Sequence, residues 1–283
     1  IEKWSVRLMP TLVILIVALI IYVSLQDGAI DGWRAYLIPD FSKVTDPELL
    51  ISAMGQAFFS MSLGVGTMLV YGSYIAKSEN LPALGASVAL VDIGVAVLAG
   101  MLIIPAMYVA QANGVAIFTE SGTLIEGDAL IFNVLPSLFA SIGPIGVVIA
   151  SVFFALMSIA AVTSSISMLE VPVSYLVEDK AVSRTKAVWV MTLVILGIST
   201  VIIANFGDLF GLVITVTTQY SQPLLGLIMC VFVGWVWRRN AILSELKEGF
   251  AGAKQSLFWK IWPVYVKFVC PIIIGVMFIR TVL

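Results

Sequence analysis

Long apolar stretches separated by short polar connections dominate the sequence, and their lengths predict helices that span a membrane. A spanning helix needs roughly 20 apolar residues. The predicted spans lie at residues 8–26, 46–76, 81–111, 143–177, 184–207, 209–238 and 261–283. A shorter apolar stretch at 128–142 predicts a helix within a loop. The expected fold class is therefore all-α, a polytopic transmembrane helix bundle in a single domain.

The distribution of charge supports these spans and indicates their orientation, because cytoplasmic connections of membrane proteins are rich in Lys and Arg. With residue 1 in the cytoplasm, the cytoplasmic segments hold 11 of the 15 Lys and Arg residues and the outer segments hold 3, with Lys267 inside a span. The outer connections are acidic instead, so the loop helix at 128–142 is expected to be extracellular. We predict a multi-pass protein of the plasma or inner membrane.

Composition narrows the classes of function. The chain is 60% hydrophobic and 11% charged, whereas soluble domains carry about 25% charged residues, so the lipid bilayer is the expected solvent. A net charge of −2 argues against nucleic acid as a partner. The absence of His removes the commonest catalytic base, and Cys230 and Cys270 lie in apolar runs where they are interpreted as small buried hydrophobes. We expect no enzymatic activity.

The second predicted span contains residues that weaken a helix at membrane depth. Gly64 and Gly66 lower helix propensity, and the hydroxyls of Ser60 and Ser62 compete for backbone groups. Unwound backbone in a membrane is tolerated only where it lines a cavity, and there it offers carbonyl oxygens to a cation and N–H groups to an anion. Close packing of helices through small residues explains the same pattern.

Two further places carry polar groups inside predicted spans. Asp92 in the third span is costly unless it has a partner, so it indicates either function or pairing with another helix. In the fourth span Ala160, Thr163 and Ser164 lie on one helical face and supply hard oxygen ligands for an alkali cation, although simple packing of hydroxyls is an alternative. Glu170 nearby fits a solvated or paired helix-end charge as well as a functional role.

These segments resemble the neurotransmitter:sodium symporter family, in its bacterial form. Residues 56–67 (QAFFSMSLGVGT) with 71–74 (YGSY) resemble the broken sixth helix of that family, and residues 160–170 (AAVTSSISMLE) resemble its eighth helix. Segments 232–235 (FVGW) and 262–265 (WPVY) resemble the tenth and eleventh helices. The resemblance covers the whole chain in order and implies helices five to eleven of an inverted-repeat sodium symporter fold that lacks its first four helices.

The resemblance also implies roles for single residues. The substrate, an amino acid or related small zwitterion, would contact Phe59, Ser60, Ser62, Gly64, Val65, Ser164 and Met168. Sodium would bind at two sites, the first including Ser60 and Asp92 and the second including the Ala160 carbonyl, Thr163 and Ser164. Tyr74 and Glu178 match the cytoplasmic gate, and Asp208 is the nearest match to an outer-gate carboxylate.

Departures from the family pattern refine these expectations. Many relatives have Asn where this chain has Asp92, and the position used in chloride dependence is Ala96 here. We expect Asp92 to supply the fixed negative charge that chloride supplies in other members, so no chloride requirement is expected. Val65 replaces a Phe of the leucine-selective relative, which widens the pocket and favours bulky apolar or aromatic amino acids.

The resemblance implies that half of each sodium site comes from N-terminal helices that these residues do not include. Those missing helices are therefore an expected partner. The 283 residues alone are expected neither to bind nor to transport. Three rival interpretations stay open: a seven-span receptor, which the charge distribution opposes, an intramembrane enzyme, and a non-transporting binding or regulatory subunit. The favoured interpretation is a sodium-coupled symporter that works by alternating access.

Overall fold

The computed structural model describes the chain except for residues 1, 119–123, 125–129, 142 and 283. The described residues form helices almost throughout, with an isolated antiparallel bridge between Phe118 and Leu124, so the all-α prediction is confirmed for them. The α-helices are α1 (Glu2–Ser24), α2 (Ala29–Leu37), α3 (Pro47–Ser60), α4 (Thr67–Tyr74), α5 (Leu81–Ala112), α6 (Leu135–Ser141), α7 (Pro144–Glu178), α8 (Arg184–Ala204), α9 (Phe206–Ile214), α10 (Gln222–Val231), α11 (Arg239–Gly249), α12 (Leu257–Val264) and α13 (Cys270–Val282).

Short segments of tighter or wider helix join these elements. The 3-10 turns are η1 (Phe41–Lys43) and η5 (Ala253–Gln255), and the π-helical segments are η2 (Leu130–Val134), η3 (Thr215–Ser221), η4 (Phe232–Val236) and η6 (Tyr265–Val269). A π-helical turn accommodates one extra residue without ending the helix. The segments η3 and η6 therefore lie inside long continuous helices, and η4 forms the last turn of the Phe206–Val236 helix.

Five continuous stretches of described residues are long and apolar enough to cross a membrane. They are Leu81–Ala112, Pro144–Glu178, Arg184–Ala204, Phe206–Val236 and Leu257–Val282. Met9–Ser24 and Ala29–Leu37, bent by 118° at their junction, make a sixth if the pair counts as one span. The seven predicted spans add 8–26, which is the greater part of α1, and 46–76, which the structure divides into α3 and α4.

Some predicted boundaries differ from the observed ones or lie outside the described residues. The last predicted span starts at residue 261, but its helix begins at Leu257 because the Ser256 side chain accepts a hydrogen bond from the Trp259 N–H and caps the first turn. The predicted loop helix at 128–142 has both its ends outside the described residues, and η2 and α6 lie between them. Residues 1 and 283, which bound the first cytoplasmic segment and the last span, are outside as well.

The chain divides into two compact units by its contacts. Unit 1 comprises Ile1–Phe41 and Val91–Ser165, and its core joins α1, α5, α6 and α7 through buried apolar side chains. Gly32 of α2 packs closely on α5, where an added Cβ would lie 2.5 Å from the Cα of Pro105. This unit contains Asp92 and the Ala160–Ser164 segment of α7.

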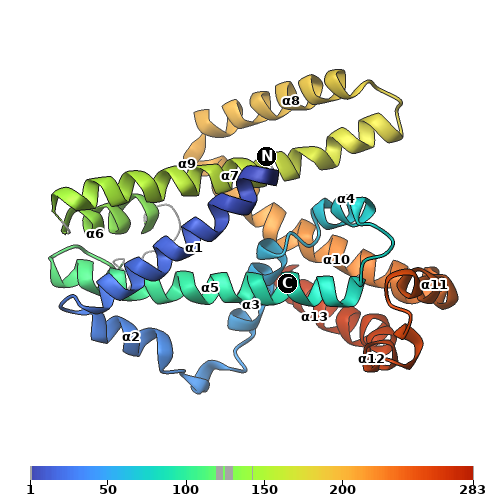
Figure 1. The fold of residues 1–283 in the computed structure, drawn as a ribbon, viewed down its shortest axis with the longest axis horizontal. Helices are drawn as coiled ribbons and strands as arrows, with labels where there is room; N and C mark the ends of the chain where they lie inside the picture. The colour runs from blue at the N-terminus through green and yellow to red at the C-terminus, as the bar shows by residue number, and fades with distance from the viewer. Residues whose placement is uncertain (1, 119–123, 125–129, 142, 283) are drawn as a thin grey trace. The chain divides into compact units, whose positions relative to one another are not determined.

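Unit 2 comprises Ser42–Leu90 and Ile166–Leu283, and α5 and α7 each continue into it. Within it α3, α10 and α13 pack against one another (Figure 1). A separate cluster of buried residues joins α11, η5 and α12 through Ile242, Leu246, Ala253 and Trp259. Unit 2 contains the interrupted helix that the sequence analysis singles out.

Candidate functional site

The helix that begins at Pro47 stops at Ser60 and resumes at Thr67, so six residues, Met61–Gly66, separate α3 from α4. Three of the residues in this break have positive φ, namely Ser62 (53°), Gly64 (78°) and Gly66 (83°). Two glycines adopt this conformation at little cost, whereas Ser62 is an exception among non-glycine residues. The break is therefore a defined structure that the sequence specifies.

The glycines of the break also allow close contact with neighbouring helices. A Cβ at Gly64 would overlap the backbone of Gln222 in α10, and a Cβ at Gly66 would lie 2.9 Å from a methyl group of Val171 in α7. Both glycines are thus required for their φ angles and for the space around them. The break is held between α10 and the second half of α7.

The break exposes backbone groups of opposite polarity. The N–H groups of Gly64, Val65 and Gly66 have no backbone hydrogen-bond acceptor among the described residues. They precede the N-terminus of α4, where the helix dipole favours an anion, while the C-terminus of α3 directs carbonyl oxygens that favour a cation. One short segment can therefore contact both charges of a small zwitterion and a nearby cation.

Side chains in the last turn of α3 and in the break face different surroundings. Phe58 is buried against Gly226 of α10, whereas the next residue, Phe59, is 51% exposed. Ser60 is exposed and Ser62 is half-buried. The predicted substrate residues Phe59, Ser60, Ser62, Gly64 and Val65 therefore lie together on the break and on the last turn of α3.

The second predicted group of ligands lies on α7 in unit 1. The Thr163 hydroxyl donates a hydrogen bond of 2.8 Å to the carbonyl oxygen of Ala160, which places these two oxygens side by side. Ser164 follows on the same helix, and Asp92 lies on α5. Because these four residues belong to unit 1 and the break belongs to unit 2, their meeting in a sodium site stays a prediction.

Two tyrosines connect α4 to α7 within unit 2. The Tyr71 hydroxyl donates to the Ser167 hydroxyl, and the Tyr74 hydroxyl donates to Oε1 of Glu170 at 3.0 Å. Met168, a predicted substrate residue, lies between these two contacts on α7 and is 47% exposed. The second half of the broken helix is thus fixed alongside α7.

Glu170 lies at the centre of a charge cluster that also includes Tyr74, Ser174 and Arg184. Its Oε1 accepts hydrogen bonds from Tyr74 and, at 3.2 Å, from Ser174, and its Oε2 pairs with Nη2 of Arg184 at 2.7 Å. The Glu170 side chain is 17% exposed and the Arg184 side chain is 62% exposed. The cluster joins α4, α7 and the start of α8.

Tyr74 and Glu178 are the residues that the resemblance assigns to the cytoplasmic gate, and the carboxylate that Tyr74 contacts in the structure is that of Glu170. Glu178 is exposed at the last turn of α7 and forms no ion pair within the described part of the chain. Asp208, the predicted outer-gate residue, is exposed in the first turn of α9. The sequence signal for this cluster is the four-residue spacing between Glu170 and Ser174, which places both side chains on one face of a helix.

Two buried polar side chains beside the break were not singled out from the sequence. Gln222 is 2% exposed and Thr67 is 5% exposed, and neither the Gln222 Oε1 nor the Thr67 Oγ1 has a hydrogen-bond partner in the described structure. A buried acceptor without a partner is costly. Gln222 is one of two glutamines, with Gln219, in the apolar sixth predicted span, and a Gln at such a position was the signal that could have indicated it.

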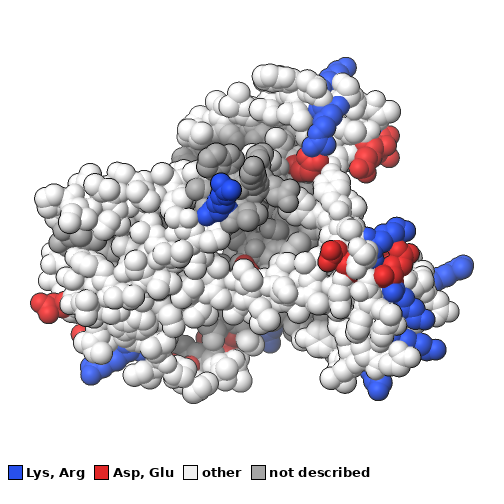
Figure 2. Space-filling model, viewed as in Figure 1, with Lys and Arg blue, Asp and Glu red and all other residues white. Residues whose placement is uncertain are grey.

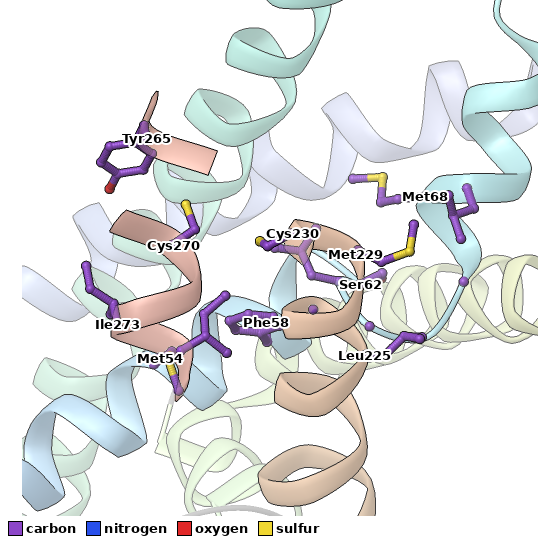
Figure 3. Close-up of a pocket in the computed structure, with 16 residues that line it drawn as sticks. Met54, Phe58, Ser62, Met68, Leu225, Met229, Cys230, Tyr265, Cys270 and Ile273 are labelled. Carbon is purple, nitrogen blue, oxygen red and sulfur yellow. The ribbon is translucent and has the colours of Figure 1, made fainter. Parts of the chain in front are cut away.

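A cavity of about 510 Å³ adjoins the break and is shown in Figure 3. Ser62 and Gly64 line it, but Phe59, Ser60 and Val65 do not, and none of its described lining residues is charged. Cys230 and Cys270 are free and point toward one another there. A zwitterion requires partners for both of its charges, so we do not assign this cavity to the substrate.

Comparison with known proteins gives relatives for nearly the whole chain. The model of the sodium:neurotransmitter symporter family matches residues 3–283. An uncharacterised sodium-dependent transporter of Haemophilus influenzae is 36% identical over 99% of this chain and 60% of its own length. A similar transporter of Bacillus subtilis is 29% identical over 100% of this chain and 62% of its own length.

A solved structure shares the fold. The crystal structure of MhsT in complex with L-phenylalanine matches with a TM-score of 0.83 and 33% identity, and covers 97% of this chain and 61% of MhsT. The chain thus spans about three-fifths of the length of these relatives. Its apolar helices and its relatives make it a multi-pass membrane protein. The chain belongs to the sodium:neurotransmitter symporter family.

Proposed function

We propose that the whole protein takes up amino acids or related small zwitterions together with sodium, by alternating access. The observation that carries this proposal is the break at Met61–Gly66, which presents backbone N–H groups and carbonyl oxygens within an apolar helix pair. Backbone of this kind is costly in a membrane unless a ligand or water satisfies it. Membership of the family supports sodium as the coupling ion.

In this proposal, sodium binds at two sites, of which the first adjoins the substrate carboxylate. The first site includes Ser60, Asp92 and the substrate carboxylate, and the second includes the Ala160 carbonyl, Thr163 and Ser164. The hydrogen bond from Thr163 to Ala160 uses the hydroxyl proton, so the lone pairs of that hydroxyl are directed elsewhere. This orientation supports Thr163 as a ligand for a hard cation.

The substrate carboxylate is proposed to bind at the N-terminus of α4, with Phe59, Ser62, Val65, Ser164 and Met168 around the rest of the molecule. The small side chain of Val65 leaves room for a bulky apolar or aromatic group. A relative with the same fold binds L-phenylalanine, which supports this class of substrate. Sodium and substrate then drive transport if both stabilise the same occluded arrangement.

The first test measures sodium affinity in the full-length protein after removal of single hydroxyls. Ser60→Ala and Thr163→Val should each weaken sodium-dependent amino acid binding by about tenfold, because a lost ligand costs on the order of 1.4 kcal/mol. Ser165→Ala is the matched control, since the Ser165 hydroxyl donates to the Ala161 carbonyl on α7 and is not a proposed ligand. Unchanged sodium affinity in both variants would remove the assigned sites.

The second test concerns chloride. We propose that the carboxylate of Asp92 stabilises the nearby sodium by fixed charge, so uptake by the full-length protein should be the same in chloride and in gluconate buffers. Asp92→Asn removes that charge and should lower sodium affinity by about tenfold or more. Uptake that stops in chloride-free buffer would refute this role for Asp92.

A further inference from the structure

A second cavity in unit 2 contains no residue of the break. It has a volume of about 260 Å³ and lies between η4, the start of α11 and the α12–η6 helix. Two cations line it, Arg239 and Lys267, together with Trp237, Trp259 and Trp262. None of its described lining residues is acidic. The cavity is therefore basic and aromatic.

Both cations contact aromatic rings. The guanidinium of Arg239 lies 5.3 Å from the centre of the Trp259 ring, and the Lys267 ammonium lies 4.3 Å from the Trp235 ring and 5.6 Å from Phe268. Neither cation forms an ion pair with a described residue. An aromatic face compensates only part of the lost hydration of a cation. An anion bound in the cavity would compensate the rest of the hydration that the two cations lose.

The sequence around the cavity and its contacts indicate that it lies toward a membrane boundary. Trp235 lies next to the end of one apolar stretch, Phe206–Val236, and donates its indole N–H to the Lys267 carbonyl at 3.2 Å, while Lys267 lies within the next stretch, Leu257–Val282. Tryptophan is enriched where a membrane meets water, and the long apolar stem of a lysine lets its ammonium extend toward that boundary from within a helix. The orientation predicted from the Lys and Arg distribution places this boundary on the cytoplasmic side.

The surface beside the cavity favours anions as well. The connection between the two apolar stretches carries Arg238, Arg239, Lys247 and Lys254. Figure 2 shows Lys and Arg side chains gathered over α11 and α12. Of the two acidic residues on α11, Glu248 pairs with Lys77 at 3.7 Å. The cytoplasmic leaflet is the membrane surface that carries anionic lipid.

We propose that this cavity binds the phosphate of an anionic phospholipid from the cytoplasmic leaflet. Arg239 and Lys267 contact the phosphate, since a guanidinium donates two parallel hydrogen bonds to phosphate oxygens and an ammonium adds a point charge. Trp259 and Trp262 pack beside the glycerol and the first methylenes of the acyl chains. A lipid at this position stabilises the junction of η4 with η6, where Gly234 packs against the Lys267 backbone.

The experiment uses the full-length protein, purified in detergent, stripped of lipid, and free of sodium and amino acids. Phosphatidylglycerol and phosphatidylcholine are titrated separately, and bound lipid is counted by native mass spectrometry. One phosphatidylglycerol should bind in preference to phosphatidylcholine. The double variant Arg239→Gln/Lys267→Gln should bind it about 25-fold more weakly, because each cation contributes roughly fivefold. The control Lys247→Gln/Lys254→Gln removes the same charge outside the cavity and should bind normally.

Further arms separate the alternatives. Arg239→Lys keeps the charge and should retain most of the binding, so it distinguishes loss of a cation from a folding defect. Inorganic phosphate at matched ionic strength should not raise the melting temperature, whereas phosphatidylglycerol should. Equal stabilisation by inorganic phosphate, or equal weakening by the control pair, would overturn the proposal. Because no sodium or substrate is present, the result does not depend on whether the protein transports amino acids.

Discussion

The break at Met61–Gly66 and the cluster around Glu170 lie at opposite ends of α4, and they are polar for different reasons. At the break the polarity comes from the backbone, through N–H groups that the helix no longer uses. At the cluster it comes from side chains, through a carboxylate that pairs with Arg184 and accepts bonds from Tyr74 and Ser174. Glycines organise the N-terminal end of α4, whereas charge pairing between residues distant in the sequence organises its C-terminal end.

This difference indicates how each end responds to substitution. Backbone polarity depends on φ angles and on space, so it tolerates no added side chain at the glycines. The cluster depends on a carboxylate that is 17% exposed and a guanidinium that is 62% exposed, so solvent compensates part of any loss. We therefore expect the largest effects at the break and graded effects at the cluster.

The largest expected effect is that of Gly64→Ala. The added methyl group would overlap the Gln222 backbone while the residue is held at a φ of +78°, and backbone strain alone costs about 1–3 kcal/mol. The variant should lower the thermal unfolding temperature in detergent by several degrees and abolish substrate binding. Thermal unfolding and a binding assay on the same preparation measure both effects.

Gly72→Ala is the matched control for that substitution, because Gly72 lies on α4 with no heavy atom within 4 Å of an added Cβ. It should be neutral or slightly stabilising, since Ala favours a helix interior by about 1 kcal/mol relative to Gly. If Gly64→Ala and Gly72→Ala behave alike, the break is less constrained than its geometry indicates.

The sequence predicts the break better than the cluster, for a physical reason. Gly64 and Gly66 are local signals, because their effect on a helix depends on the few residues around them. The contact between Tyr74 and Glu170 joins residues 96 positions apart, and no local pattern indicates which carboxylate a tyrosine reaches. Glu170 was accordingly not among the residues assigned to the gate from the sequence, which were Tyr74, Glu178 and Asp208.

Burial was equally hard to predict from the sequence. Gln222 is 2% exposed because α10 packs on Gly64, a contact between distant segments. The fold class could be predicted, because a long apolar stretch has few alternatives to a helix in a bilayer. The division into α3 and α4 follows from the same glycines, but the exact turn at which each helix ends depends on packing against neighbouring helices.

A middle-sized effect is expected when the ion pair of the cluster is broken. Arg184→Gln leaves the mostly buried Glu170 carboxylate without a cation and should destabilise the protein by about 2 kcal/mol. Glu170→Gln leaves an exposed guanidinium, which water solvates, and should cost less, about 1 kcal/mol. Chemical or thermal unfolding of the two variants, side by side, measures the asymmetry. A larger loss for Glu170→Gln than for Arg184→Gln would contradict this account.

The smallest effect is expected from removing the Tyr71 hydroxyl, and it provides the finest test of the comparison. Tyr71 and Tyr74 lie one turn apart on α4, and each donates to α7, but Tyr71 donates to the neutral Ser167 hydroxyl and Tyr74 to a carboxylate. A bond to an ionised acceptor is roughly twice as strong as a neutral one. Tyr71→Phe should therefore cost about 0.5–1 kcal/mol and Tyr74→Phe about 1.5–2 kcal/mol in thermal unfolding. Equal costs would mean that the charge of Glu170 adds nothing to the hydrogen bond by which Tyr74 links α4 to α7.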